Sequence, residues 1–148
     1  MLPPPILFSQ DEDSRAADEA EESMRIVIVE DDYLVASEME GALTEAGFEV
    51  AAVASSAEEI LDLAATARPA LAVMDIRLRG ARDGIDAALE LFAKHGIRCI
   101  FATAHQTPET RARAEPAKPL AWVPKPYVMP ALVDAVRRAV RDLREGIR

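Results

Sequence analysis

The chain has 148 residues, half of them hydrophobic, which is enough for one ordinary domain with a buried core. Its formal net charge of −9 argues against a nucleic-acid-binding surface, which needs an excess of lysine and arginine. The sequence contains no run of 18 apolar residues and no recognisable secretory signal, so no membrane association is expected.

The charge is unevenly distributed. Residues 1–23 contain seven acids and one arginine, whereas residues 24–148 contain 19 acids and 16 basic residues. We interpret residues 1–23 as a disordered acidic leader, with a partner-docking tail as the alternative, and residues 24–148 as the folded domain. A start at Met24 would leave that domain complete. The single cysteine, Cys99, lies in an apolar run and is predicted to be buried, which favours a cytoplasmic location.

The first half of the domain alternates between two patterns. Residues 25–30, rich in Ile and Val, predict a strand buried on both faces, and residues 33–46 have apolar side chains at helical spacing. Residues 48–54 predict a second strand. Ser56 is a helix-capping residue, so we expect the next helix over residues 57–67.

The alternation continues in the second half. Residues 70–75 predict the third strand, and the helix that follows a glycine-containing loop is stopped by Gly96. Residues 97–103 and 120–124 predict the fourth and fifth strands, and residues 129–144 form the closing amphipathic helix.

One predicted helix is weak. Residues 107–119 should form the fourth helix, and Pro108 is a favourable residue at a helix start. However, Pro116 and Pro119 shorten it, and its only apolar residues besides proline are alanines. Because alanines bury little area, we expect this segment to be loosely held, with fast amide hydrogen exchange across 109–117.

Five strand–helix units with buried strands predict an α/β fold, namely a doubly wound, five-stranded parallel sheet in three layers. The expected strand order is 2-1-3-4-5. In such a sheet, ligands bind at the carboxyl ends of strands one and three, where the order reverses. Glu30, Asp31 and Asp75 follow these two strands.

Thr103 and Lys125 follow the fourth and fifth strands, so five polar side chains are expected at one edge of the sheet. Two carboxylates about 4 Å apart repel by roughly 4 kcal/mol at an effective dielectric constant of about 20, so three converging acids are unstable unless they are protonated or neutralised by a cation. Because every ligand in this cluster is an oxygen, Mg²⁺ is the predicted metal.

The same residues suit phosphoryl transfer. A carboxylate such as Asp75 can act as a nucleophile toward phosphorus, Lys125 can neutralise phosphoryl oxygens, and the hydroxyl of Thr103 can donate to one after transfer. Each residue alone is more simply read as a cap or loop residue. The joint spacing carries the prediction: 44 residues separate Asp31 from Asp75, 28 separate Asp75 from Thr103, and 22 separate Thr103 from Lys125.

From Arg25 to Arg144 this pattern resembles the response-regulator receiver domains, whose fold is of the flavodoxin or CheY type. The resemblance implies the following roles: Glu30 and Asp31 bind the metal, Asp75 is the phosphoacceptor and a metal ligand, Thr103 is the switch hydroxyl, and Lys125 contacts the phosphate.

Three further roles come from the resemblance alone. The backbone carbonyl of Arg77 would be a metal ligand, and the peptide bond between Lys125 and Pro126 would be cis. Trp122 occupies the position of an aromatic switch residue, usually Tyr or Phe. The simpler alternative is that Trp122 fills space on an edge strand.

The stretch Phe101-Ala102-Thr103-Ala104-His105 resembles a motif of single-domain receivers in the bacterial general stress response. The chain departs from that motif because Ala104 and His105 replace Gly and Tyr or Gly. Arg79 also replaces the usual Pro four residues after the phosphoacceptor.

The resemblance therefore implies a stand-alone response regulator, which is a phosphoacceptor signalling domain rather than an enzyme. A sensor histidine kinase or a phosphotransfer protein would supply the phosphoryl group. Output is expected by protein–protein contact through the face made by the fourth helix, fifth strand and fifth helix, or by action as a phosphate carrier or sink. We expect a monomer or weak homodimer.

Two alternatives compete with this assignment. Phosphohydrolases of the haloacid-dehalogenase type also combine Asp, Thr and Lys, but they normally carry Asp-x-Asp after their first strand. Here Asp75-Ile76-Arg77 follows the third strand and has no second acid at that spacing, which disfavours this class. The other alternative is a pseudo-receiver, a binding module that is never phosphorylated.

Overall fold

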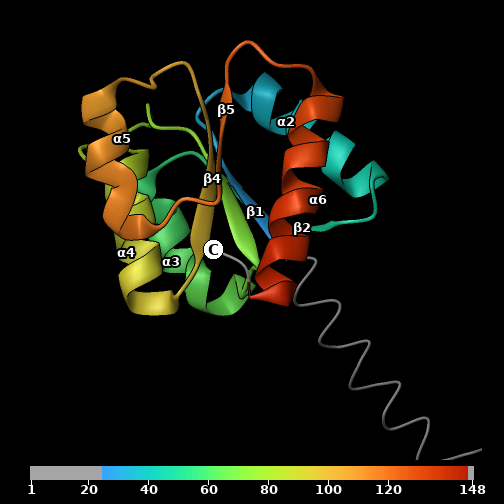
Figure 1. Cartoon of the computed structure of the whole chain (residues 1–148), viewed down its shortest axis with the longest axis horizontal. Helices are drawn as coiled ribbons and strands as arrows, with labels where there is room; N and C mark the ends of the chain where they lie inside the picture. Colours follow the sequence, from blue (N-terminus) through green and yellow to red (C-terminus); the bar gives the residue numbers. More distant parts are fainter. Residues whose placement is uncertain (1–24, 147–148) are drawn as a thin grey trace, which may run out of the picture.

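The computed structural model describes residues 25–146, so the predicted disordered leader over residues 1–23 lies outside the described residues. The elements, with the labels of Figure 1, are β1 (Arg25–Val29), α2 (Tyr33–Glu45), β2 (Glu49–Ala54), α3 (Ala57–Ala67), β3 (Leu71–Met74), α4 (Gly84–His95), β4 (Arg98–Thr103), α5 (Pro108–Ala114), the 3₁₀ turn η1 (Glu115–Ala117), β5 (Ala121–Pro124) and α6 (Met129–Glu145).

The five strands form one parallel sheet in the order β2-β1-β3-β4-β5, which confirms the predicted fold class and topology. In the sheet register, Met74 is paired with Val29 on one side and with Phe101 on the other. The residues that follow β1, β3 and β4 therefore meet at one edge of the sheet.

Helices cover both faces of the sheet (Figure 1). Val27 and Val29 of β1 pack into the cluster with α3, α4 and α5, whereas Ile26 and Ile28 pack into the cluster with α2 and α6. This two-sided burial explains why β1 is a continuous apolar run rather than an alternating one. No described helix has the length and apolar character needed to cross a membrane.

Side-chain caps start four of the helices. Each cap accepts a hydrogen bond from a backbone N–H of the first helical turn; the caps are Asp32 for α2, Ser56 for α3, Asp83 for α4 and Thr107 for α5. Because Asp32 directly follows the acidic pair, α2 begins next to the strand-end residues and fixes the chain direction there.

The segment predicted as a weak fourth helix is short. Helix α5 ends at Ala114, and η1 continues only to Ala117, before Lys118 adopts a left-handed conformation with φ of 51°. Ala114 and Ala117 are the only buried residues of the two elements. The expectation that this segment buries little apolar area is confirmed, and fast hydrogen exchange stays a prediction.

Strand β5 is one edge of the sheet and has four residues, ending in Pro124. Pro124 is paired with Thr103, and Trp122 is paired with Phe101. Proline has no N–H to donate, so it is suited to the end of an edge strand.

Candidate functional site

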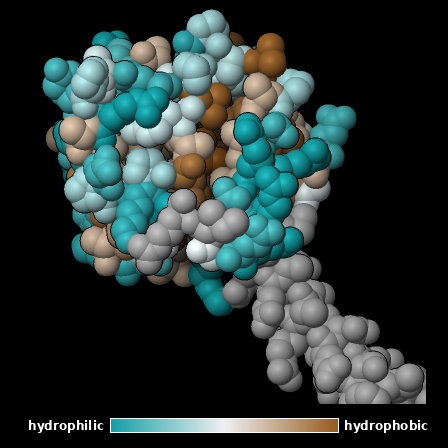
Figure 2. All heavy atoms as spheres, viewed as in Figure 1, coloured by the Kyte–Doolittle hydropathy of each residue, from teal (hydrophilic) through white to brown (hydrophobic). Residues whose placement is uncertain are grey.

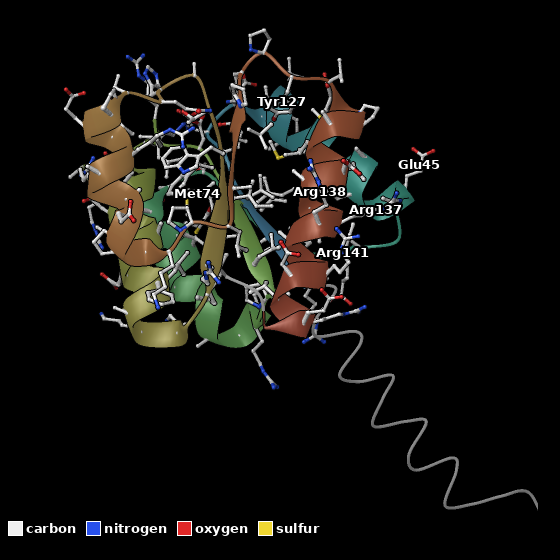
Figure 3. All side chains as sticks on the ribbon, in the orientation of Figure 1. Glu45, Met74, Tyr127, Arg137, Arg138 and Arg141 are labelled. Carbon is white, nitrogen blue, oxygen red and sulfur yellow. The ribbon has the colours of Figure 1, made fainter. Side chains whose placement is uncertain are left out.

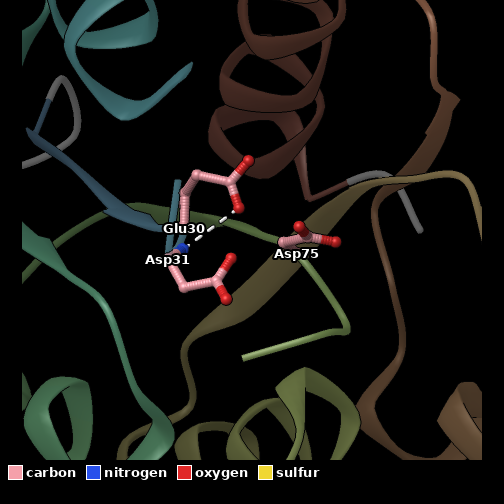
Figure 4. A group of neighbouring side chains, drawn as sticks. All are labelled: Glu30, Asp31 and Asp75. Carbon is pink, nitrogen blue, oxygen red and sulfur yellow. Dashed lines mark hydrogen bonds between the residues drawn. The ribbon is translucent and has the colours of Figure 1, made fainter. Parts of the chain in front are cut away.

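Three carboxylates converge at the edge of the sheet where the strand order reverses (Figure 4). Oxygen atoms of Glu30, Asp31 and Asp75 all lie within 4.8 Å of one another. The sequence prediction that these acids form one cluster is confirmed by this geometry.

Backbone hydrogen bonds of the sheet position two of these acids. The N–H of Asp75 donates to the carbonyl of Val29 at 2.9 Å, and the N–H of Glu30 donates to the carbonyl of Ala54 at 2.9 Å. Each acid is thus fixed one residue beyond its strand. The Oδ1 atom of Asp75 also accepts from the N–H of Ile76 at 2.7 Å, which restricts the orientation of the carboxylate.

Lys125 reaches the acids from the end of β5. Its Nζ donates to Oε1 of Glu30 at 2.9 Å and to Oδ2 of Asp75 at 3.1 Å. Burial disfavours the charge on this ammonium, but the hydrogen bonds to the two carboxylates outweigh burial and raise the pKa of Lys125. Lys125 therefore remains protonated and supplies one positive charge to a site with three carboxylates.

Glu30 is the most buried acid of the cluster, with 3% of its surface exposed. This burial, reinforced by Asp75 and opposed by Lys125, raises the pKa of Glu30 to about 7. Its Oε2 accepts from the N–H of Asp31 at 3.1 Å. The raised pKa reflects chiefly the loss of hydration of this carboxylate on burial.

Thr103 is fully buried at the end of β4. Its Oγ1 accepts from the N–H of His105 at 3.2 Å, and its carbonyl accepts from the N–H of Lys125 at 3.1 Å. The structure thus places Thr103 beside the lysine, as predicted. The backbone links of Thr103 to both flanking segments mean that a movement of this residue would be passed to both.

The helix after Asp75 packs directly against its peptide. A Cβ atom added at Gly84 would lie 1.9 Å from the carbonyl oxygen of Asp75 and 2.9 Å from the Cα of Ile76. Only glycine permits this approach, so Gly84 fixes the distance between α4 and the Asp75 backbone. The sequence predicts only a glycine-containing loop before this helix, and no local pattern indicates the contact of Gly84 with Asp75.

Trp122 lies on β5 and is partly buried. Its ring stacks on Phe101 with centroids 4.6 Å apart, and the guanidinium of Arg111 lies 4.7 Å from the Trp122 ring centroid on the α5 side. Arg111 also donates to the side chain of Gln106 at 2.7 Å. The position of Trp122 between β4 and α5 is compatible with both predicted roles, switch residue and space-filling aromatic.

A second arginine of α5 was not singled out by sequence reasoning. Arg113 donates to both carboxylate oxygens of Asp83 at 2.6 and 2.8 Å and to Oδ1 of Asp86 at 2.8 Å. Asp83 and Asp86 also form a reciprocal capping box at the start of α4. The spacing of these two acids is a visible capping signal, but the sequence contains no signal for the partner Arg113 30 residues away.

Two remaining predictions concern the residues beside the cluster. The peptide bond between Lys125 and Pro126 is cis, as the resemblance implied. Arg77 is exposed two residues after Asp75, and the use of its carbonyl as a metal ligand stays a prediction.

The donor set fits a hard divalent cation. The cluster contains carboxylate oxygens and no sulfur or imidazole, which favours Mg²⁺ over softer metals. The charge count agrees, because three carboxylates face a single ammonium, that of Lys125. Glu30, Asp31 and Asp75 are the residues that would hold the ion.

The chain is similar to two curated regulators. The chain is 33% identical to the transcriptional regulatory protein PdtaR of Mycobacterium tuberculosis over 121 residues, which cover 82% of this chain and 58% of PdtaR. It is 36% identical to the phyllosphere-induced regulator PhyR of Methylorubrum extorquens over 122 residues, covering 82% of this chain and 43% of PhyR. The chain thus spans about half the length of these relatives.

A solved structure agrees in fold. The signal receiver domain of a modulated diguanylate cyclase from Desulfovibrio desulfuricans G20 superposes with a TM-score of 0.76 at 32% identity, covering 82% of this chain and 97% of that one. The family model of the response regulator receiver domain matches residues 26–137. With the sheet topology and the strand-end residues in place, the chain belongs to the response regulator receiver domain family.

Proposed function

We propose that the protein accepts a phosphoryl group on Asp75 from the phosphohistidine of a sensor histidine kinase or a phosphotransfer protein. One observation carries the proposal: Asp75 lies among two further carboxylates and is directly contacted by the ammonium of Lys125. This set supplies a nucleophile, a cation site and a fixed positive charge within one cluster.

In the proposed step, a carboxylate oxygen of Asp75 forms a bond to phosphorus while the bond from phosphorus to the histidine nitrogen breaks. The electron pair of the broken bond returns to the imidazole of the donor. Lys125, already beside Asp75, neutralises charge on the phosphoryl oxygens. The buried Thr103 hydroxyl donates to one of these oxygens after transfer.

Mg²⁺ held by Glu30, Asp31 and Asp75, and by the carbonyl of Arg77, would offset the negative charge that opposes approach of a phosphoryl group. The chain's own contribution is to hold Asp75 in place. Its carboxylate is oriented by the N–H of Ile76, and its backbone by Val29 and Gly84.

Radiolabel transfer from acetyl phosphate or from a phosphorylated kinase tests the proposal. We expect Mg²⁺-dependent labelling of the full chain and its loss in Asp75→Asn. Asp62→Asn, which changes an exposed acid on α3, should retain full labelling. Labelling that survives in Asp75→Asn would reject Asp75 as the acceptor, and a folded chain without labelling would favour the pseudo-receiver.

The face of α5, β5 and α6 is the proposed output surface. Figure 2 shows hydrophobic atoms at the centre of this face, between the surfaces formed by α5 and α6. A groove there is lined by Trp122, Val123 and three alanines of α6, namely Ala131, Ala135 and Ala139. Arg138 and Asp142 also line this groove, and its mixture of apolar and charged residues supports contact with another protein.

Beryllofluoride, a phosphoryl analogue, tests this output face. We expect its addition with Mg²⁺ to change the fluorescence of Trp122 and the amide shifts of α5 and β5. Thr103→Ala should still bind the analogue and lose these distant changes. An unchanged Trp122 spectrum in the presence of demonstrated binding would leave Trp122 as a space-filling residue.

We also propose a signalling pathway, a cellular location and an oligomeric state. The motif from Phe101 to His105 and the similarity to PhyR support a receiver of the general stress response. A cytoplasmic location is proposed from the buried, reduced Cys99. A monomer or weak homodimer is proposed, and sedimentation with and without beryllofluoride would test it.

A further inference from the structure

A groove of about 450 Å³ separates the end of α2 from the C-terminal half of α6, on the side of the molecule remote from the Asp75 cluster. We propose that this groove binds the chain's own acidic segment, residues 11–22. The proposal is independent of phosphoryl transfer and concerns a second, intramolecular binding surface.

The groove combines an apolar floor with basic walls. Phe48 and Val140 are buried at its base, and Arg137 and Arg141 line it four residues apart on α6. Residues at that spacing lie on the same face of a helix. Figure 3 shows both arginines on α6 in the region beside the end of α2. Within residues 25–146, neither arginine forms an ion pair.

Two acids lie close to the groove. Glu145 lines it, and Glu45 is at the end of α2, yet within residues 25–146 neither acid forms an ion pair with Arg137 or Arg141. Arg144 is a third basic residue of the lining, so the positive charges outnumber Glu145. An acidic segment therefore complements this surface.

The acidic segment has the matching charge. Residues 11–22 contain all seven acids of the leader and a single arginine, Arg15. Such a segment places several carboxylates within a short length of chain. The rest of the domain is itself slightly acidic, so a basic groove on α6 is a distinct feature of its surface.

The connection to the folded domain begins beside the groove. Arg25, the first described residue, is paired with Glu49 in the sheet, and its Nε donates to that carboxylate at 3.1 Å. Glu49 directly follows Phe48 of the groove floor. Because a chain spans at most about 3.6 Å per residue, Glu22 lies within about 11 Å of Arg25. The acids therefore reach the groove without a long linker.

We expect several weak ion pairs to act together here, because the acidic segment is tethered to the domain that carries the groove. A single exposed ion pair contributes little. A short tether, however, keeps the acids at a high effective concentration near the arginines. Because the contacts are exposed, salt should screen them, and the association should weaken as ionic strength rises.

The test uses a spin label in the leader. Ser14→Cys provides an attachment site in the full chain between two groups of acids. Cys99 does not compete, because it is fully buried and burial raises the pKa of its thiol to about 12. At low salt we expect broadening of the amide signals of Phe48 and Arg141, and its loss at high salt.

Charge variants supply the control. Arg137→Glu with Arg141→Glu should abolish the broadening, whereas Arg138→Glu should not, since Arg138 lines the other groove and pairs with Asp134. If the double variant does not fold, Glu21→Gln with Glu22→Gln weakens the same association from the leader side. These acids lie outside the described residues of the domain.

Three results would overturn the proposal. The first is the absence of broadening at the groove at low salt, and the second is broadening that survives both charge changes. The third is equal broadening in a mixture of spin-labelled chains with isotope-labelled, unmodified chains, because that would assign the groove to the leader of a second copy.

Discussion

Helices α4 and α5 cover the same face of the sheet but are held there by different forces. Helix α4 buries Ile85, Leu91 and three smaller residues and begins with a complete capping box. Helix α5 buries one alanine, Ala114. Its remaining anchors are polar: Arg113 binds the acids at the start of α4, and Arg111 lies over Trp122.

This difference separates a fixed element from an adjustable one. Apolar burial of side chains such as Leu91 is non-directional and contributes about 25 cal/mol per Å² of area removed from water. Exposed charge pairs contribute far less and depend on salt and pH. We infer that α4 moves with the sheet, while α5 can change position at small cost in free energy.

Leu91→Ala should produce the largest effect, because it removes a fully buried side chain from the apolar anchor of α4. We expect a loss of about 2–5 kcal/mol in the free energy of unfolding, measured by urea denaturation. Leu63→Ala, at a position with 38% of the surface exposed, is the matched control and should change stability far less. Equal losses would contradict the assigned difference in burial.

Gly84→Ala tests the close approach of α4 to Asp75. The added Cβ would meet the Asp75 carbonyl, so we expect a cost of about 1–3 kcal/mol and slower phosphoryl acceptance. Gly41→Ala is the control, because a Cβ there meets nothing within 4 Å inside helix α2. That variant should be more stable than the parent by about 0.5–1 kcal/mol. A tolerated Gly84→Ala would remove the proposed spacing role.

Arg113→Ala breaks the polar anchor of α5. We expect faster amide hydrogen exchange across 109–117 and a loss of about 0.5–1 kcal/mol in unfolding free energy at neutral pH. Arg138→Ala, which removes an exposed pair with Asp134 on α6, should leave exchange in α5 unchanged. Strong protection of 109–117 in the parent chain would contradict the weak attachment of α5.

The same variant has a predictable pH dependence. Burial disfavours ionisation of Asp83, but the hydrogen bonds from Arg113 outweigh it and lower the pKa of Asp83 below its ordinary value of 3.8. A lowered carboxyl pKa stabilises the fold above the ordinary value, and this stabilisation is lost as the pH falls through the folded-state pKa. The stability difference between the parent and Arg113→Ala should therefore shrink in acid.

Arg111→Ala should cost no more stability than Arg113→Ala, at most about 0.5–1 kcal/mol, because it removes an exposed cation–π contact and an exposed hydrogen bond to Gln106. Its clearest readout is a shift in the emission of Trp122, the only tryptophan in the chain. Arg82→Ala, which breaks a pair with Glu90 on α4, should leave this emission unchanged. An unaltered spectrum in Arg111→Ala would show that Arg111 does not contact the ring in solution.

Sequence patterns predicted the fold because a strand buried on both faces appears in the sequence as a continuous run of apolar residues. The apolar run before Glu30 and the one before Asp75 mark strands covered on both sides, and the alternation with helices fixes a parallel sheet. The topology then brings those acids together. Predicted strands exceeded the observed ones by a residue or two. At the carboxyl ends of β1 and β3, the hydrogen bonds of Glu30 and Asp75 continue past the assigned strand.

Other contacts of the site correspond to no pattern in the sequence. The pairing of Arg113 with Asp83 depends on how two helices lie side by side, which no spacing along the chain encodes. The approach of Gly84 to Asp75 likewise depends on tertiary geometry, although the glycine itself was visible. The bridge from Lys125 to Glu30 joins residues 95 positions apart. Sequence reasoning therefore found the participants in the cluster but not their contacts.

The short final strand has a consequence for how copies or partners can meet. An exposed sheet edge usually invites another backbone to extend the ladder, and such growth leads to aggregation. Strand β5 offers only four residues and ends in Pro124, which cannot donate to a neighbouring strand. Strand addition at this edge would therefore be short, so we expect any association there to depend mainly on side-chain contacts, which are reversible and selective.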